Sequence, residues 1–379
     1  MLLLQKITNN KNTEYYKFLN IPVCIIDKKH NFKIKRLFFG LFVKEKAFDN
    51  YTETITIKIF NFTVYKRIET LNKIKINWFN LYNREIIKLT EIKKELEKII
   101  DKRYTKVFIL KSNLGEAYLF LKFIINNLIN CTDIPVIIVT KKAHISLIKM
   151  LTPNIDYIFT KSLKYEINEK LFKINNQDIY TVFPMKFYLD TEQKTAQIAT
   201  NYLYEMYDYF RISNDNKHNF NKIKINENII NEIDNYLARN DINHFIFISK
   251  EATTESPIPD TFWQGLESKL DIKIIYNNKN VDIAETYYLA KKASVIISLR
   301  SGLSEILSDC ENTHIILYTD FKDRYKFPKL PKETIIKSYS VKALELNTSN
   351  TFEILYHDKD KDKIIENIIN IVKQKERTK

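Results

Sequence analysis

The chain has 379 residues, of which 45% are hydrophobic and 28% are charged. This length is too great for a single hydrophobic core and predicts two or more domains, and the composition is ordinary for a soluble protein. The net charge of +14 comes mostly from lysines spread along the whole sequence, so we expect no nucleic-acid partner. Two interpretations stay open: a generally basic surface, or a weak attraction to an anionic membrane surface or substrate. The cysteines are scattered, which excludes a disulfide framework, and the apolar runs are too short to span a membrane. Because the first residues also lack the pattern of a signal peptide, we expect a cytoplasmic protein, which could also contact the inner face of the cell membrane peripherally.

Residues 1–88 are expected to form a β-hairpin repeat region. Segments 16–23, 35–42, 57–64 and 75–82 each place aromatic residues around Asn or Gly, with an apolar run and lysines nearby. Alternating β-branched and aromatic residues around such a turn are typical of hairpins, so we expect small stacked hairpins. Two interpretations stay open: a β extension that only packs on the next domain, or a surface that docks to a membrane or a partner.

Two stretches of alternating strands and helices follow. An amphipathic helix at 89–103 leads into strands at 106–111, 135–139 and 157–159, with helices at 116–129 and 144–151. Residues 195–240, rich in Asn and Lys, are expected to form helices and a polar linker. The second stretch then has expected strands at 244–249, 272–276, 295–299 and 314–318. Its expected helices are 261–270, 283–293, 305–310 and 361–373.

Apolar strands that alternate with helices predict parallel sheets covered on both faces. We therefore predict an α/β fold class: two Rossmann-like domains, 89–215 and 216–379, that face a cleft and follow the hairpin region.

Two of the four glycines occupy equivalent places in these domains. Gly115 and Gly302 each lie between a buried strand and a helix. Glycine permits a sharp turn and a close approach of ligand to backbone. Because ligands of open α/β sheets bind at the carboxyl ends of strands, both turns are expected to face the cleft.

The segment around Gly302 has the stronger ligand-binding pattern. The amides of Ser301, Gly302 and Leu303 would point from a helix start, where a diphosphate binds well. Ser304 adds a hydroxyl, and Arg300 adds a planar donor fork suited to phosphate. The alternative is a plain serine cap, with Glu305 favouring the helix start.

The turn around Gly115 carries an acid. Asn113 precedes the helix and Glu116 begins it, where a carboxylate can act as a general base toward an acceptor hydroxyl. Ordinary compensation of the helix dipole is the alternative for Glu116.

A third polar segment follows the strand at 244–249. Ser249, Lys250, Thr253 and Thr254 offer hydroxyls and a cation that could hold phosphate oxygens, although a simple connecting loop would have the same composition. The histidines and cysteines show no ligand spacing, and the aspartates at 358, 360 and 362 alternate with lysines in a charged tail. We expect no metal site and no cofactor.

Three motifs resemble bacterial glycosyltransferases of the GT-B fold, and most of all the lipopolysaccharide heptosyltransferases. Asn113-Leu114-Gly115-Glu116 is similar to their first Gly-Asp turn, and Ser301-Gly302-Leu303-Ser304 is similar to their Thr-Gly-Leu-Ser stretch at the diphosphate. Ala252-Thr253-Thr254, with a tryptophan downstream, is similar to their loop at the donor phosphates. The sequence departs from the family at Glu116, which replaces an aspartate, at Arg300, and at a missing lysine after the threonine pair.

The resemblance implies a metal-independent, inverting glycosyltransferase of hexosyl or heptosyl type. Residues 89–215 would form the acceptor domain and 216–379 the nucleotide-sugar domain, with closure between them. The donor would be a nucleotide-sugar, and the acceptor a glycan or glycolipid of lipopolysaccharide or capsule type. Two other functions stay open: a nucleotide-sugar epimerase of the same fold, and a non-enzymatic basic binding module.

Overall fold

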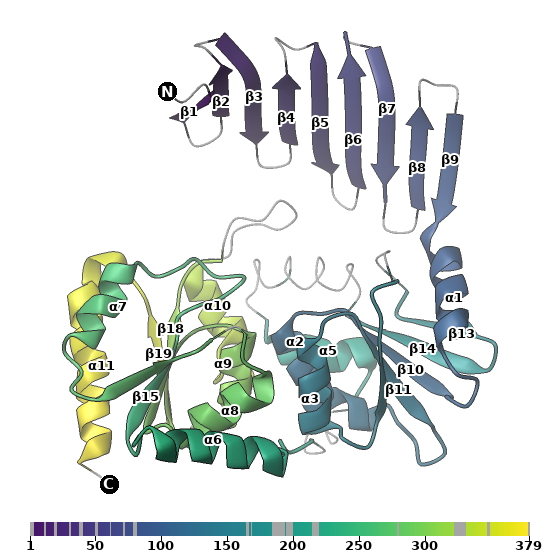
Figure 1. Ribbon diagram of the computed structural model, residues 1–379. Coiled ribbons are helices and arrows are strands. Elements are labelled where there is room, and N and C mark those ends of the chain that lie inside the picture. The colour runs from purple at the N-terminus through teal and green to yellow at the C-terminus, as the bar shows by residue number, and fades with distance from the viewer. Residues whose placement is uncertain are drawn as a thin grey trace.

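The computed structural model describes residues 4–377 apart from short stretches. These stretches are 11–12, 19–20, 30–31, 38–40, 50–51, 61, 71–72, 79–81, 164–166, 168, 184–193, 195–199, 214–219, 279, 322–330 and 347–348. The protein is a mixed α/β molecule with three sheets (Figure 1).

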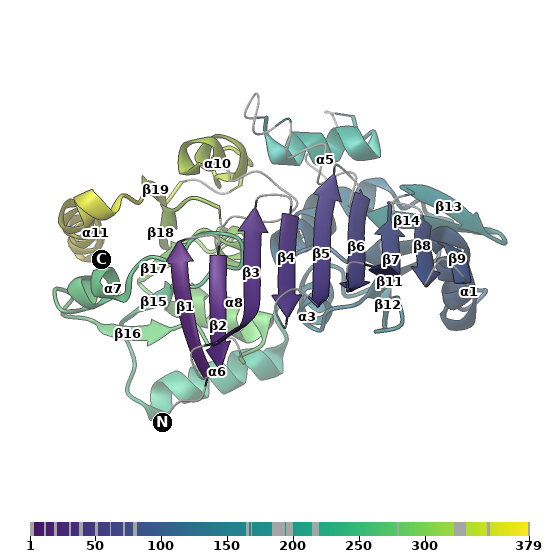
Figure 2. The ribbon, with the colours of Figure 1, turned by 90° about the horizontal axis from the view of Figure 1, so that it is seen from above.

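The chain begins with an antiparallel sheet of nine strands that pair in chain order (Figure 2). They are β1 (Leu4–Asn10), β2 (Thr13–Phe18), β3 (Ile21–Lys29), β4 (Phe32–Leu37), β5 (Phe42–Asp49), β6 (Thr52–Ile59), β7 (Phe62–Glu69), β8 (Lys73–Trp78) and β9 (Tyr82–Ile87). The structure joins the strands of the expected hairpins into one continuous sheet. Strands of neighbouring hairpins also pair with each other, and this edge-to-edge pairing satisfies backbone groups that separate hairpins would leave open.

The second sheet has the order β12-β11-β10-β14-β13. Its strands are β10 (Lys106–Leu110), β11 (Pro135–Val139), β12 (Asp156–Phe159), β13 (Leu171–Ile174) and β14 (Gln177–Val182). The helices around it are α1 (Lys88–Ile99), α2 (Leu114–Leu119), α3 (Ala143–Leu151) and α5 (Tyr202–Phe210). The expected helix at 116–129 is irregular: α2 passes into a π-helix (Phe120–Ile124) and a 3-10 turn (Ile125–Asn127).

The third sheet has the order β16-β15-β17-β18-β19 and is parallel throughout. Its strands are β15 (Phe245–Ser249), β16 (Lys273–Tyr276), β17 (Val295–Leu299), β18 (Thr313–Tyr318) and β19 (Thr351–Leu355). The helices are α6 (Glu227–Arg239), α7 (Asp260–Glu267), α8 (Ile283–Lys292), α9 (Gly302–Leu307), α10 (Lys332–Tyr339) and α11 (Lys361–Glu376). Both glycine turns follow the middle strand of their sheet, β10 in the first half and β17 in the second.

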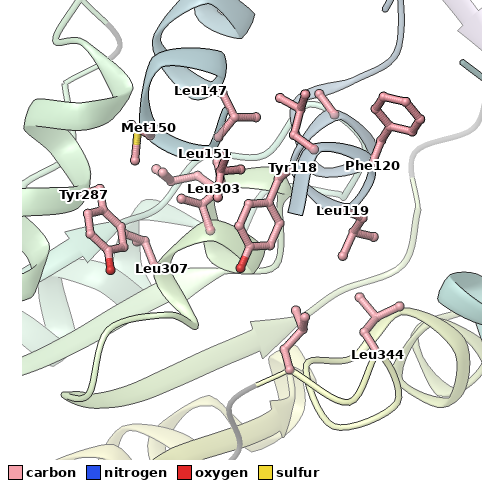
Figure 3. Packing of buried hydrophobic residues seen from close by; sticks show 14 of the residues in the cluster. Tyr118, Leu119, Phe120, Leu147, Met150, Leu151, Tyr287, Leu303, Leu307 and Leu344 are labelled. Atoms are coloured by element: carbon pink, nitrogen blue, oxygen red, sulfur yellow. The ribbon is translucent and has the colours of Figure 1, made fainter. Parts of the chain in front are cut away.

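The two α/β halves share one hydrophobic core. Successive residues of a strand point to opposite faces, and Phe108 of β10 and Phe247 of β15 both belong to this central cluster, while their neighbours face separate outer clusters under α1 and under α7 and α11. Figure 3 shows side chains of α2 and α3 packed close to those of α8 and α9. Rotation of one half against the other would therefore have to separate packed side chains.

Polar contacts also join the halves at this layer. The ammonium of Lys122 pairs with the Asp309 carboxylate, and both side chains are largely buried. The Ser146 hydroxyl donates to Asp282 over 2.5 Å at the start of α8. Breaking buried pairs of this kind is costly, so these contacts fix the relative placement of the two sheets.

The described helices include none that is both long and apolar enough to cross a membrane.

Candidate active site

A cavity of about 900 Å³ lies between the carboxyl ends of the strands of the two halves. The first half lines it with the turn after β10 and with Lys141 after β11, and the second half lines it with the turn after β17, the loop after β15 and Asn277 after β16. The sequence-predicted residues among its lining are Asn113, Gly115, Glu116, Thr253, Thr254, Arg300, Ser301, Gly302, Leu303 and Glu305.

The two glycine turns touch each other. A Cβ atom added to Gly302 would lie 2.3 Å from the backbone nitrogen of Gly115, and one added to Gly115 would lie 2.1 Å from Oε2 of Glu305. Neither glycine has a positive φ. We expected glycine here so that a ligand could approach the backbone. Instead, the facing backbone and the Glu305 carboxylate occupy the space beside the two glycines.

The start of α9 is closed by its own serines. The Ser301 hydroxyl accepts from the Ser304 amide over 3.3 Å, and the Ser304 hydroxyl accepts from the Ser301 amide over 2.8 Å. This is the serine cap given above as the alternative, and Ser304 is buried away from the cavity. Gly302 and Leu303 line the cavity, and the capping bonds use neither of their amides.

Arg300 lies in a buried group of charges. Its Nη2 donates to Oε1 of Glu305 over 2.5 Å, and its Nε lies 3.8 Å from Oε1 of Glu255. Both carboxylates are almost wholly buried, and the other oxygen of Glu255 accepts from the amide and hydroxyl of Thr319. Nε of Arg300 and Oε1 of Glu255 have no hydrogen-bond partner among the described residues. The group therefore retains one hydrogen-bond donor and one acceptor that a ligand could use.

Burial dominates the electrostatics of this group. It raises the pKa of Glu255 to about 8 and that of Glu305 to about 7, although Arg300 opposes both shifts. Burial alone would lower the pKa of Arg300, but the carboxylates of Glu305 and Glu255 raise it above its ordinary value. One arginine thus faces two acids that hold part of their protons at neutral pH.

Glu116 lies across the cavity on the first half. Its side chain is half-buried, and Oε1 accepts a hydrogen bond from the side-chain Nδ2 of Asn113 over 3.3 Å. It is near enough to Arg300 and Glu305 to raise the pKa of both groups. An acid accessible from the cavity thus lies opposite a buried cation held by the other half.

Only some of the predicted residues at the end of β15 and in the loop that follows reach the cavity. Thr253 and Thr254 line the cavity, whereas Ser249 is buried and accepts from the Asn277 side chain over 3.4 Å. The Lys250 ammonium lies 4.9 Å from the ring centre of Tyr276 and does not line the cavity. The structure thus brings the threonine pair, but neither Ser249 nor Lys250, to the cavity.

The sequence reasoning missed several cavity residues. Lys111, Lys141 and Asn277 each stand directly or nearly after a strand end, so the rule that selected the glycine turns would have selected them too. Four aromatic side chains also line the cavity, and Arg300 lies over two of their rings, Phe321 at 5.8 Å and Tyr339 at 5.3 Å. No local pattern marks those rings, because they come from distant segments.

Metal-binding clusters of three or more His, Cys, Asp or Glu are absent from the described part of the chain. Two histidines are buried outside the lining of the cavity, and burial lowers the pKa of His144 to about 4 and that of His314 to about 3. His314 makes a hydrogen bond of 2.8 Å with the Ser298 hydroxyl inside the third sheet, away from the cavity.

No family model matches the chain, and no curated protein matches it. Among solved structures it is similar to a family 9 glycosyl transferase from Veillonella parvula, with 9% identity, a TM-score of 0.46, and coverage of 73% of this chain and 99% of that one. It is also similar to the ADP-heptose lipopolysaccharide heptosyltransferase II of E. coli, with 7% identity, a TM-score of 0.43, and coverage of 72% and 99%. It is similar as well to TarM, with 10% identity, a TM-score of 0.25, and coverage of 99% of this chain and 73% of the TarM chain. At such identities and scores, a function has to be argued from the residues of the cavity.

Proposed function

We propose that the protein transfers a sugar from a nucleotide-sugar to a glycan or glycolipid acceptor in the cavity between its α/β halves. The observation that carries the proposal is the pairing across one cavity of Glu116 from the first half with Arg300 from the second. Transfer of an activated sugar needs a base near the acceptor hydroxyl and a cation near the leaving diphosphate.

The reaction would proceed as a direct displacement. The Glu116 carboxylate takes the proton of the acceptor hydroxyl while its oxygen bonds to the anomeric carbon of the sugar. The bond from that carbon to the diphosphate oxygen breaks, and the nucleoside diphosphate leaves with the electron pair. A single displacement inverts the anomeric configuration, and no step in it requires a metal.

The second half would hold the donor. The cavity-lining amides of Gly302 and Leu303, the Thr253 and Thr254 hydroxyls and the Arg300 guanidinium can all contribute donors to phosphate oxygens. Ser304, Ser249 and Lys250 have no part in this version of the site, because the first two are buried and Lys250 lies over Tyr276. The aromatic residues around Arg300 give the cavity an apolar wall suited to a flat base or a sugar ring.

The bound diphosphate would change the protonation of the site. Arg300 faces two carboxylates whose pKa values burial raises to about 8 and about 7. A second anion beside Arg300 favours their protonated forms, so donor binding should take up protons. The affinity for a nucleoside diphosphate should then decrease as the pH rises from 6.5 to 8.5.

The test is thermal unfolding with a panel of nucleoside diphosphates and nucleotide-sugars at millimolar concentration. A ligand present at about 100 times its dissociation constant stabilises the native state by about 2.7 kcal/mol. We expect one nucleotide base to raise the melting temperature by several degrees in the wild type, and by much less in Arg300→Lys, which keeps the charge but loses the planar fork. Lys149→Ala, exposed on α3, is the control.

Turnover separates this proposal from its competitors. An epimerase converts the stabilising nucleotide-sugar alone, without an acceptor, and the isomer can be detected by nuclear magnetic resonance. A basic binding module gives no thermal shift with any nucleotide. A transferase releases nucleoside diphosphate only in the presence of acceptor, apart from slow hydrolysis by water.

A further inference from the structure

Six large apolar side chains are exposed among the described residues of the nine-stranded sheet and its turns, and five of them gather at one end of the sheet; the sixth, Ile87, lies at the other end. Leu41 and Phe42 adjoin the β4–β5 connection, Phe60 and Phe62 adjoin the β6–β7 connection, and Trp78 ends β8. A meander brings every second connection to the same end of the sheet. Figure 1 shows that this end, formed by the ends of β4, β6 and β8, points away from the two α/β halves. We call these five residues the aromatic rim.

Phe60 is the most unusual member of the rim. Its side chain is 65% exposed, and its backbone has φ of 48°, a conformation that disfavours bulky residues. Its amide donates to the Leu41 carbonyl over 2.9 Å, which ties the two neighbouring turns together. Glycine or asparagine would relieve both costs, so an exposed phenylalanine held in this conformation indicates a function for the ring.

Basic residues lie directly behind the rim. Arg36 and Lys58 face the same side of the sheet one residue from the strand ends, and Lys35 and Lys44 stand opposite each other one residue further on. Like charges directly opposite each other destabilise a sheet unless an anion neutralises them. Among the described residues, Lys58 pairs with Glu45 at 3.0 Å, whereas Lys35 and Lys44 have no ion-pair partner.

Three of the four acidic residues of 32–78 lie toward the other end of the sheet, and the fourth, Glu45, pairs with Lys58. Glu53 and Glu69 are register partners there, and Glu69 pairs with the buried Lys88 at the start of α1 over 2.7 Å. The sheet therefore has a basic, aromatic end that points outward, whereas at the end near α1 the acidic residues pair with Lys46, Arg67 and Lys88. Residues 32–78 contain ten basic and four acidic residues.

We propose that the aromatic rim inserts into the headgroup region of an anionic phospholipid bilayer, with Lys35 and Lys44 among the lysines that contact the lipid phosphates. Aromatic rings favour the membrane interface, and basic side chains near the surface add attraction to anionic lipid. With a strand rise of about 3.3 Å per residue, the basic positions lie roughly 3–7 Å behind the rim, a depth suited to headgroups.

A second copy of the chain fits this end less well. Two rims in contact would bring the basic rows of both copies close together, and like charges would oppose the association. The bilayer supplies both the apolar interface and the negative charge. This inference is independent of the proposed sugar transfer, because it involves no residue of the cavity.

The experiment is flotation with vesicles of phosphatidylcholine alone and with one quarter phosphatidylglycerol. We expect the wild type to float with the anionic vesicles and to lose this binding as salt is raised. Trp78 reports insertion directly: the second tryptophan, Trp263, is buried, so a blue shift of emission on adding vesicles comes from Trp78. Trp78→Phe should abolish the shift.

Variants separate the rim from a general basic surface. Phe60→Ser and Phe62→Ser should each lower the partition coefficient about ten-fold, because each removes a buried phenyl ring from the interface. Lys35→Gln and Lys44→Gln should each lower it about five-fold on anionic vesicles. The controls are Tyr236→Ser, an exposed aromatic on α6, and Lys98→Gln on α1, which should leave binding unchanged.

Three results would overturn the proposal. The first is wild-type protein that stays with neither vesicle at low salt. The second is rim variants that bind vesicles as the wild type does. The third is rim variants that dissociate a wild-type oligomer in sedimentation velocity without changing vesicle binding, which would assign the rim to a second copy of the chain. None of these results bears on nucleotide binding by the cavity.

Discussion

The two α/β halves have the same plan but opposite chemistry at the same place. Each places a glycine turn after the middle strand of a sheet, and the turns meet where Gly115 faces Gly302. The first half offers Glu116, a half-buried acid supported by Asn113. The second offers Arg300, a cation buried between Glu255 and Glu305. Neither turn can act on a donor and an acceptor alone, so the contact between the halves is what would make a site.

The largest effect is expected at the acid. Glu116→Gln should lower the rate of sugar transfer by about 10²–10⁴-fold, because the amide cannot accept the acceptor proton. It should leave the affinity for the nucleoside diphosphate within about two-fold of the wild type, since the donor lies on the other half. A variant that transfers sugar at the wild-type rate would remove Glu116 from the mechanism and return it to a helix-dipole role.

The contact between the turns should be the next most sensitive point. Gly302→Ala places a Cβ atom 2.3 Å from the Gly115 backbone nitrogen, so the halves must move apart. We expect a loss of about 2–3 kcal/mol in the free energy of unfolding, as for other overpacked sites. Urea unfolding measures this change.

Gly265→Ala is the matched control for that substitution. Gly265 lies inside α7, where an added Cβ would approach only the flexible end of Ile365, at 3.1 Å. Alanine is favoured over glycine in a helix by up to about 1 kcal/mol, so this variant should be neutral or slightly more stable. Equal losses at positions 302 and 265 would contradict the tight contact between the turns.

The buried acids should make stability depend on pH. Glu255 and Glu305 have folded-state pKa values of about 8 and about 7, above their ordinary value. The folded protein therefore keeps protons that the unfolded chain has lost, and stability should fall by about 1–2 kcal/mol between pH 6.5 and 8.5. Unfolding in urea across this range measures the change, and Glu255→Gln should flatten it.

Two histidines act in the opposite direction at the lower part of this pH range. Burial lowers the pKa of His144 and of His314, so their contribution to stability grows as the pH rises and is complete only about one unit above the ordinary histidine pKa, at pH ~7.5. Stability that rises from pH 6.5 to 8.5 would show that Arg300 keeps both carboxylates ionised.

The sequence predicts the central strands better than the outer ones. β10, β15 and β17 are buried at every residue, so they read as unbroken apolar runs. β13 and β14 were missed because Lys173, Gln177 and Asp178 interrupt the apolar pattern, although β14 pairs directly with β10. β19, a half-exposed edge strand, was missed for a similar reason.

In the candidate site, too, some features follow from local sequence patterns and others depend on contacts between distant segments. Local patterns located Glu116, Arg300 and both glycine turns, because each follows a strand end. They could not show that Glu255 and Glu305 enclose Arg300, since that requires the loop after β15 and the turn after β17 to come together. Nor could they show that the glycines face each other, because that contact depends on how the two halves pack.

The most direct test of the shared site is calorimetric titration of the stabilising nucleoside diphosphate into three proteins: wild type, Glu116→Gln and Arg300→Lys. The account predicts one binding site per chain, with proton uptake in buffers of different ionisation enthalpy. Affinity should be unchanged in Glu116→Gln and about ten-fold or more lower in Arg300→Lys. Binding that Arg300→Lys leaves intact, or no binding at millimolar nucleotide, would contradict a donor site in this cavity.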